Sequence, residues 1–144
     1  MKAVGFIVPN QWLCRVMDFG HSNGYVAVSP DSLVHGKHYD LLENILVHGG
    51  LTFSEPVIYK ERTFGSDSLI RPEYVGRRNF LLDLAIEVSG NLSDIEDDWW
   101  IVGFDTCHYG DNSENWSEDR VIEEVKRLMD QIEKLDNSFI ETSK

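Results

Sequence analysis

Residues 99–104, which read Trp-Trp-Ile-Val-Gly-Phe, decide the fold, because their apolar side chains occupy neighbouring as well as alternate positions. A strand with one face in water would alternate apolar and polar residues. This run therefore predicts a central strand that is covered on both faces. Two further runs, residues 2–8 and 24–28, are rich in Val and are bounded by Gly, Asn or Pro. Their composition predicts two more strands.

The C-terminal part of the chain predicts an amphipathic helix. Ser117 can accept a free backbone N–H as N-cap, and the acidic Glu118 and Asp119 suit the positive end of the helix dipole. Apolar residues then recur at spacings of three and four and form one stripe: Val121, Val125, Leu128, Met129, Ile132 and Leu135. We expect this stripe to cover the sheet.

The sequence between these elements is less decisive. Residues 60–78 are mixed in polarity and interrupted by Gly and Pro, which indicates a loop. Residues 80–88 fit either another strand or a short helix. Together the elements predict an α+β fold, with a small, mostly antiparallel or mixed sheet covered by a C-terminal amphipathic helix. We expect a single domain over residues 1–136, followed by a loose tail at residues 137–144.

Length and composition set the broad class of protein. A chain of 144 residues with 42% hydrophobic residues can form one domain with a core. The net charge of −12 repels a phosphate backbone and argues against general nucleic-acid binding. Cys14 and Cys107 are too few for a disulfide scaffold. The first apolar run is too short for a signal peptide or a membrane span. We expect a cytoplasmic protein without a membrane partner, and a homo-oligomer remains open.

Two segments, residues 47–53 and 103–112, combine glycines with titratable side chains. Glycines allow a backbone to approach a ligand closely and can free N–H groups for an anion. Loops at strand ends are also where binding groups usually lie. The candidate acid–base or metal-ligating residues are His48, Asp105, His108 and Asp111, and the candidate ligand-binding residues are Gly49, Gly50, Thr52 and Tyr109.

Each of these features also has a structural interpretation. A Gly-Gly pair is usually a turn, and an Asp at a strand end is usually a cap. A divalent metal is compatible with these side chains, but no ligand spacing requires one, and the sequence implies no other cofactor. Residues 111–115 resemble the start of an EF-hand loop, but Trp116 stands where that loop needs Gly. No Walker-type loop, dinucleotide fingerprint or nucleophile elbow is present.

Four blocks of the sequence carry a resemblance. They are residues 23–28 (Asn-Gly-Tyr-Val-Ala-Val), 36–40 (Gly-Lys-His-Tyr-Asp), 47–54 (Val-His-Gly-Gly-Leu-Thr-Phe-Ser) and 99–111. In this order they resemble a family of small, mostly uncharacterised bacteriophage and prophage proteins, over about residues 23–135. The resemblance implies action in the cytoplasm of an infected bacterial host. By analogy, it suggests counter-defence through removal of a nucleotide-derived immune signal.

Three hypotheses about function follow. In the first, a pocket between the two segments binds a small nucleotide-derived phosphorylated ligand and cleaves its phosphodiester, as a phosphodiesterase-like hydrolase. The glycine amides hold a phosphate, His48 and His108 act as acid and base, and the imidazoles are oriented by Asp105 and Asp111. In the second, the same pocket sequesters the ligand intact. In the third, an acidic interaction protein inhibits a host factor; this fits the charge but makes no use of the His-Gly segments.

The first hypothesis sets a geometric condition. The four acid–base candidates must reach a shared cleft, because catalytic groups act at about 3 Å from the substrate. Residues 51–53 then form a strand beside residues 99–104, with the Thr52 hydroxyl directed at the cleft. We expect Trp99 or Trp100 to pack under it.

Overall fold

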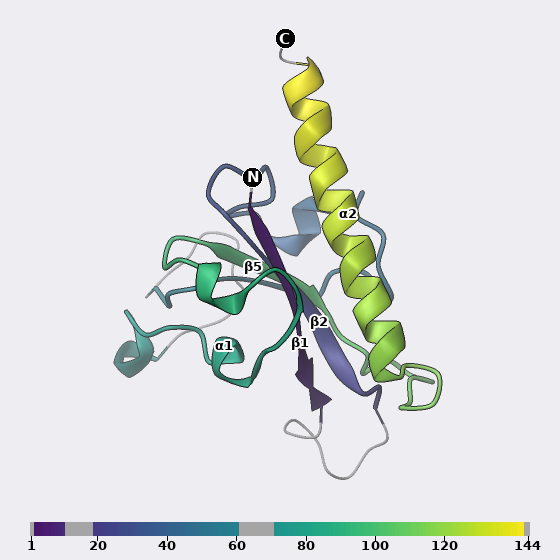
Figure 1. Ribbon diagram of the computed structural model, residues 1–144. Helices are drawn as coiled ribbons and strands as arrows, with labels where there is room; N and C mark the ends of the chain where they lie inside the picture. Colours follow the sequence, from purple (N-terminus) through teal and green to yellow (C-terminus); the bar gives the residue numbers. More distant parts are fainter. Residues whose placement is uncertain (1, 11–18, 61–70, 143–144) are drawn as a thin grey trace.

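The computed structural model describes residues 2–10, 19–60 and 71–142, and it has the predicted α+β fold (Figure 1). Five antiparallel strands form one sheet in the order β3-β5-β2-β1-β4. The strands are β1 (Ala3–Pro9), β2 (Ser22–Val28), β3 (Phe53–Pro56), β4 (Ile86–Ser89) and β5 (Trp100–Phe104). The helices are α1 (Leu81–Leu84) and α2 (Glu118–Thr142), with short 3-10 turns η2 (Tyr39–Leu41), η3 (Pro72–Tyr74) and η4 (Leu92–Asp94).

Both faces of the inner strands are buried, so the sheet has two cores. Along β5, Val102 points to the face that carries α2, and Ile101 points to the opposite face. The opposite face is closed by α1 through Leu81 and by the segments around Val57 and Ile95. All five residues of β5 are buried, as the apolar run predicted. The middle strand of the sheet is β2, with β5 beside it.

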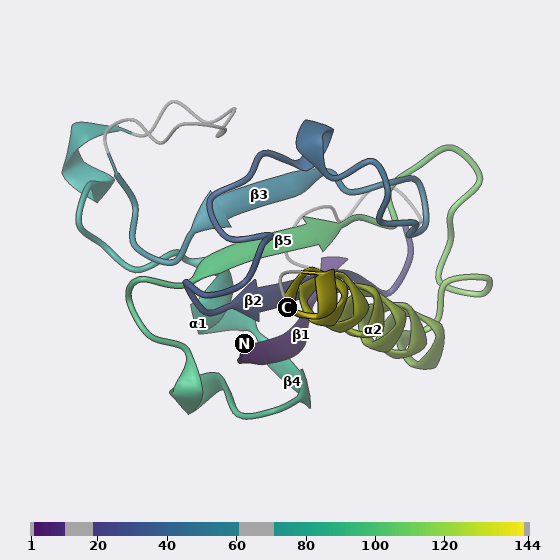
Figure 2. The same cartoon turned by 90° about the horizontal axis from the view of Figure 1, so that it is seen from above.

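Helix α2 packs closely on β1 and β2 and extends past the sheet at its C-terminal end (Figures 1 and 2). The predicted stripe is buried at Val121, Val125, Leu128 and Ile132, whereas Leu135 is exposed. Two strand glycines permit the close approach, because a Cβ on Gly5 or Gly24 would lie only 2.8 Å or 2.6 Å from a Val125 methyl. Ser117 caps the helix by accepting the Arg120 N–H at 3.4 Å.

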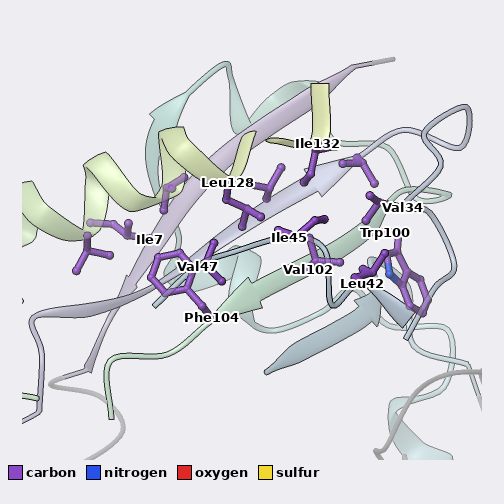
Figure 3. Packing of buried hydrophobic residues seen from close by; sticks show 14 of the residues in the cluster. Ile7, Val34, Leu42, Ile45, Val47, Trp100, Val102, Phe104, Leu128 and Ile132 are labelled. Carbon is purple, nitrogen blue, oxygen red and sulfur yellow. The ribbon is translucent and has the colours of Figure 1, made fainter. Parts of the chain in front are cut away.

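Residues 29–52 cover β5 on the same face as α2. Their side chains Val34, Leu42, Ile45 and Val47 pack against Trp100, Val102 and Phe104 (Figure 3). The segment is tied to α2 through Gln131, whose Oε1 accepts the Leu46 N–H at 2.8 Å and whose Nε2 donates to the Leu46 carbonyl at 2.9 Å. This clamp and the burial of Val47 determine where His48 lies.

Two local expectations are revised. Residues 80–88, expected to form either a strand or a short helix, contain both, because the short helix α1 is followed after one residue by the strand β4. Residues 137–142 are helical rather than a loose tail, since α2 continues to Thr142. No Gly or Pro stands in that stretch to end the helix.

Some expectations fall outside the described residues. These are the conformation of residues 61–70 within the expected loop, the placement of Cys14, and residues 143–144. None of the helices in the described part combines the length and apolar composition needed to span a bilayer.

Candidate functional site

The two His-Gly segments meet beyond the end of β5. That strand ends at Phe104, and the turn after it is closed by the Asp111 N–H donating to the His108 carbonyl at 2.9 Å. The segment clamped to α2 brings His48 against this turn, where it contacts Asp111. The expected convergence of the two segments is therefore observed.

Asp111 is the centre of a cluster with His48 and His108. Nε2 of His48 lies 2.9 Å from both carboxylate oxygens of Asp111. Nδ1 of His108 lies 3.3 Å from Asp111 Oδ2, and the His108 backbone N–H donates to the same oxygen at 2.9 Å. The two imidazoles are almost perpendicular, with centroids 5.3 Å apart. One carboxylate thus orients both rings.

The surroundings of Asp111 keep it ionised. Its side chain is only 6% exposed, and this burial acts to raise the pKa. Hydrogen bonds from the His48 side chain and the His108 backbone N–H outweigh the burial, so the pKa of Asp111 is lowered overall. The cluster therefore holds a negatively charged acceptor between two imidazoles.

Asp105 contacts the cluster at Nδ1 of His108, the same ring nitrogen that Asp111 contacts. Its Oδ1 lies 3.3 Å from His108 Nδ1 and also accepts the Cys107 N–H at 3.0 Å. Asp105 is therefore both the cap of the turn after β5 and a second acceptor beside the His108 imidazole. Among the four acid–base candidates, His48 and His108 contact Asp111 directly. Asp105 joins the cluster through His108.

The two glycines after His48 have different surroundings. Both have a positive φ, +69° at Gly49 and +80° at Gly50, which is why glycine suits these positions. A Cβ on Gly49 would overlap the imidazole of His108, whereas one on Gly50 would meet open space. Gly50 also donates its N–H to the Val47 carbonyl at 2.9 Å. Its amide, expected to hold a phosphate, is thus engaged within the turn.

The remaining ligand-binding candidates, Thr52 and Tyr109, are both exposed. Thr52 extends the β3–β5 pairing, because its N–H donates to the Gly103 carbonyl at 2.9 Å, and its side chain is exposed. Of the strand expected over residues 51–53, only Phe53 lies in β3, and Thr52 extends the hydrogen bonding to β5 by one residue. Tyr109, next to His108, is fully exposed.

The tryptophan that packs under the cluster is not one of the expected pair. Trp100 begins β5 and Trp99 precedes it, whereas the cluster follows the end of the strand, about 13 Å farther on at a rise of roughly 3.3 Å per residue. Trp99 belongs to the core opposite α2, and Trp100 donates its indole N–H to the Lys37 carbonyl at 3.2 Å. Trp116 takes the expected place, with its ring centroid 4.1 Å from that of His48.

Trp116 also carries a cation on its indole. The Arg120 guanidinium lies 4.4 Å from the ring centroid, and Arg120 Nη1 donates to the Asn115 carbonyl at 2.7 Å. The sequence contained a signal for the position of Trp116. Trp116 directly precedes the N-cap Ser117, and Val121 lies four residues after Ser117. An apolar pair at these two positions often packs together at the start of a helix.

A surface groove of about 460 Å³ begins beside His48. Its lining residues are Leu46, Val47, His48, Trp116, Arg120, Glu123, Glu124 and Arg127. His48 is the member of the cluster that borders this groove. Asp105, His108 and Asp111 are not among its lining residues, so this groove is not the expected cleft shared by all four acid–base candidates.

The cluster offers two kinds of chemistry. Imidazoles oriented by a carboxylate can transfer protons, and two imidazoles with one carboxylate can ligate a metal. Donor atoms of His48, His108 and Asp111 all lie within 4.8 Å of one another. Comparisons of the chain with family models, curated proteins and solved structures give no match, so this geometry is the basis for a functional assignment.

Proposed function

We propose that this protein binds a small nucleotide-derived phosphorylated ligand at the His48–Asp111–His108 cluster and removes it by phosphodiester cleavage. The observation that carries the proposal is the Asp111 carboxylate, which contacts both imidazoles. A bacterial immune signal is the ligand class that the resemblance to phage proteins suggests. On this proposal the protein is a small hydrolase of the infected cell's cytoplasm.

The ring nitrogens that face away from Asp111 are the groups proposed to meet the phosphate. Asp111 contacts Nε2 of His48 and Nδ1 of His108, which leaves His48 Nδ1 and His108 Nε2 for a ligand. With their partner nitrogens held by a carboxylate, such imidazoles donate to a phosphate oxygen or exchange a proton with it. The missing side chain of Gly49 gives His108 room to adopt this position.

The groove beside His48 is the proposed seat for the rest of the ligand. Arg120 and Arg127 line it, and such cations attract phosphate even in a chain with a net charge of −12. Arg127 is paired with Glu124 at 3.1 Å. Arg120 therefore has the larger role in the proposal, because its guanidinium lies on the indole of Trp116 at the wall of the groove.

The proposal is tested by incubating the chain with a panel of cyclic nucleotides and cyclic ADP-ribose isomers and analysing the products by mass spectrometry. We expect cleavage of one ligand class, loss of that cleavage in His108→Ala, and retention in the control variant His21→Ala. His21 contacts Ser22 and Glu118, outside the cluster. Urea unfolding of both variants separates lost chemistry from lost folding.

Two other outcomes would overturn cleavage and identify another function. Stoichiometric capture, with intact ligand recovered after heat denaturation, would make the protein a sequestering protein with the same site. Indifference to the whole panel, together with no effect of His108→Ala on function in infected cells, would favour an acidic protein that inhibits a host factor.

A further inference from the structure

We infer that His48, His108 and Asp111 form a binding site for one divalent transition-metal ion, with Zn²⁺ as the first expected occupant. Each residue offers one donor atom, and all three atoms lie within 4.8 Å of one another. They come from two segments whose histidines are 60 residues apart. The inference concerns the same cluster as the proposed cleavage; its catalytic consequence rests on that function, whereas metal binding can be measured without it.

The donor spacing suits a tetrahedral ion. Zn–N and Zn–O bonds of about 2.0–2.1 Å place neighbouring ligand atoms of a tetrahedron about 3.3 Å apart. His108 Nδ1 lies 3.3 Å from Asp111 Oδ2. His48 Nε2 lies 2.9 Å from the same Asp111 Oδ2, and the two imidazole donors lie within 4.8 Å of each other, so small side-chain shifts would admit the ion.

The chemistry of the donors selects the class of metal. Two imidazoles and one carboxylate suit Zn²⁺ and neighbouring first-row ions, whereas Mg²⁺ and Ca²⁺ prefer sets of oxygen ligands. A set of three protein ligands also leaves a coordination position for water, as in catalytic zinc sites. His48 and His108 therefore favour a transition metal over an alkaline-earth ion.

Contacts around the three donors hold them in place before an ion arrives. The His108 N–H fixes Asp111 Oδ2 at 2.9 Å. The indole of Trp116 packs against the ring of His48, with centroids 4.1 Å apart. Asp105 Oδ1 lies 3.3 Å from the same His108 Nδ1, so a second carboxylate faces the proposed donor nitrogen.

A bound ion would change how the proposed cleavage proceeds. Both imidazoles become ligands, and their outward nitrogens carry protons that bond to the phosphate. A water on the ion would lose a proton to solvent, and the resulting hydroxide would attack phosphorus. Its oxygen would form the new P–O bond as the ester P–O bond breaks, and the leaving oxygen would take up a proton from solvent. Cleavage that persists after complete metal removal would instead assign proton transfer to His48 and His108.

The test uses the full chain without an affinity tag, stripped of metal by chelation and dialysis. We expect isothermal titration with ZnCl₂ to give one tight equivalent, and titration with MgCl₂ to give none. Asp111→Asn and His48→Gln should each weaken Zn²⁺ binding by more than the roughly 10- to 100-fold typical of losing an outer-shell partner. The matched control His21→Gln should bind as the unaltered chain does.

Co²⁺ provides an independent readout of the same site. Its visible absorption in the unaltered chain should report a low-coordinate site with nitrogen ligands, and this band should be absent from Asp111→Asn. The inference is wrong if the chain binds no stoichiometric Zn²⁺, or if Asp111→Asn and His21→Gln bind it equally. Tight Zn²⁺ binding without turnover of the nucleotide panel would keep the metal site and reject the proposed cleavage.

Discussion

Replacing Gly49 by Ala tests how the backbone places His108, and Gly50→Ala is its matched control. Both glycines have a positive φ, so either substitution introduces a left-handed alanine, which costs about 1–2 kcal/mol. A gain of about 0.4–1 kcal/mol from the stiffer unfolded chain offsets part of this cost. We expect each backbone change to lower the free energy of unfolding by about 1 kcal/mol, or the Tm by about 3 °C.

The two variants should differ at the cluster. The new Cβ at Gly49 overlaps the His108 imidazole, whereas the one at Gly50 meets open space. Only Gly49→Ala should therefore displace His108 from Asp105 and Asp111, at a further cost of about 1 kcal/mol for the weakened hydrogen bonding. Urea unfolding measures the stabilities, and proton–nitrogen correlation spectra of the imidazoles report the ring position. Identical His108 signals in the two variants would refute the reasoning.

Three further perturbations test the fold around the site. Burial raises the pKa of Tyr25 from 10.0 to about 12, so the free energy of unfolding should fall by up to about 3 kcal/mol as the pH rises from 10 toward 12. In urea unfolding, Tyr25→Phe should lack this part of the alkaline loss. Coincident pH curves for the two proteins would contradict the prediction. Leu128→Ala should cost about 2–5 kcal/mol in the same assay, because Leu128 is fully buried between α2 and the sheet; a loss under 1 kcal/mol would argue against that packing. Gln131→Ala removes both hydrogen bonds to Leu46 and should shift the His48 imidazole signals at a cost of about 1 kcal/mol, whereas unchanged signals would show that the clamp does not position His48.

The sequence predicted the elements whose patterns are long and regular. Strands β1, β2 and β5 coincide closely with three apolar runs, and α2 begins after the expected cap at Ser117. Residues 80–88 were ambiguous because they contain a one-turn helix and a four-residue strand, each too short to show a period. The C-terminal end of α2 was missed because the apolar stripe of the helix was followed only as far as Leu135, although no helix breaker follows it.

The convergence of the two His-Gly segments was set from the sequence as a condition for a site, because both combine glycines with titratable side chains. The side chain that packs beneath these two segments was not predicted correctly from the sequence. Trp116, rather than Trp99 or Trp100, packs against His48 because residues 29–52 fold over β5 and are clamped to α2. Such contacts join segments far apart in the chain and leave no local period. The Gly50 amide was expected to be free for a phosphate, but it donates to the Val47 carbonyl. This hydrogen bond depends on how the turn closes, which the sequence pattern does not show.

The most direct test of the central claim follows the histidine imidazoles by proton–nitrogen correlation spectra during titration with the panel of cyclic nucleotides and cyclic ADP-ribose isomers. If the cluster is the functional site, one panel member should shift the signals of His48 and His108 together and leave those of His21 in place. Asp111→Asn should abolish or strongly weaken that response. A ligand that binds while the His48 and His108 signals stay unchanged, or a panel in which no member shifts them, would contradict the account.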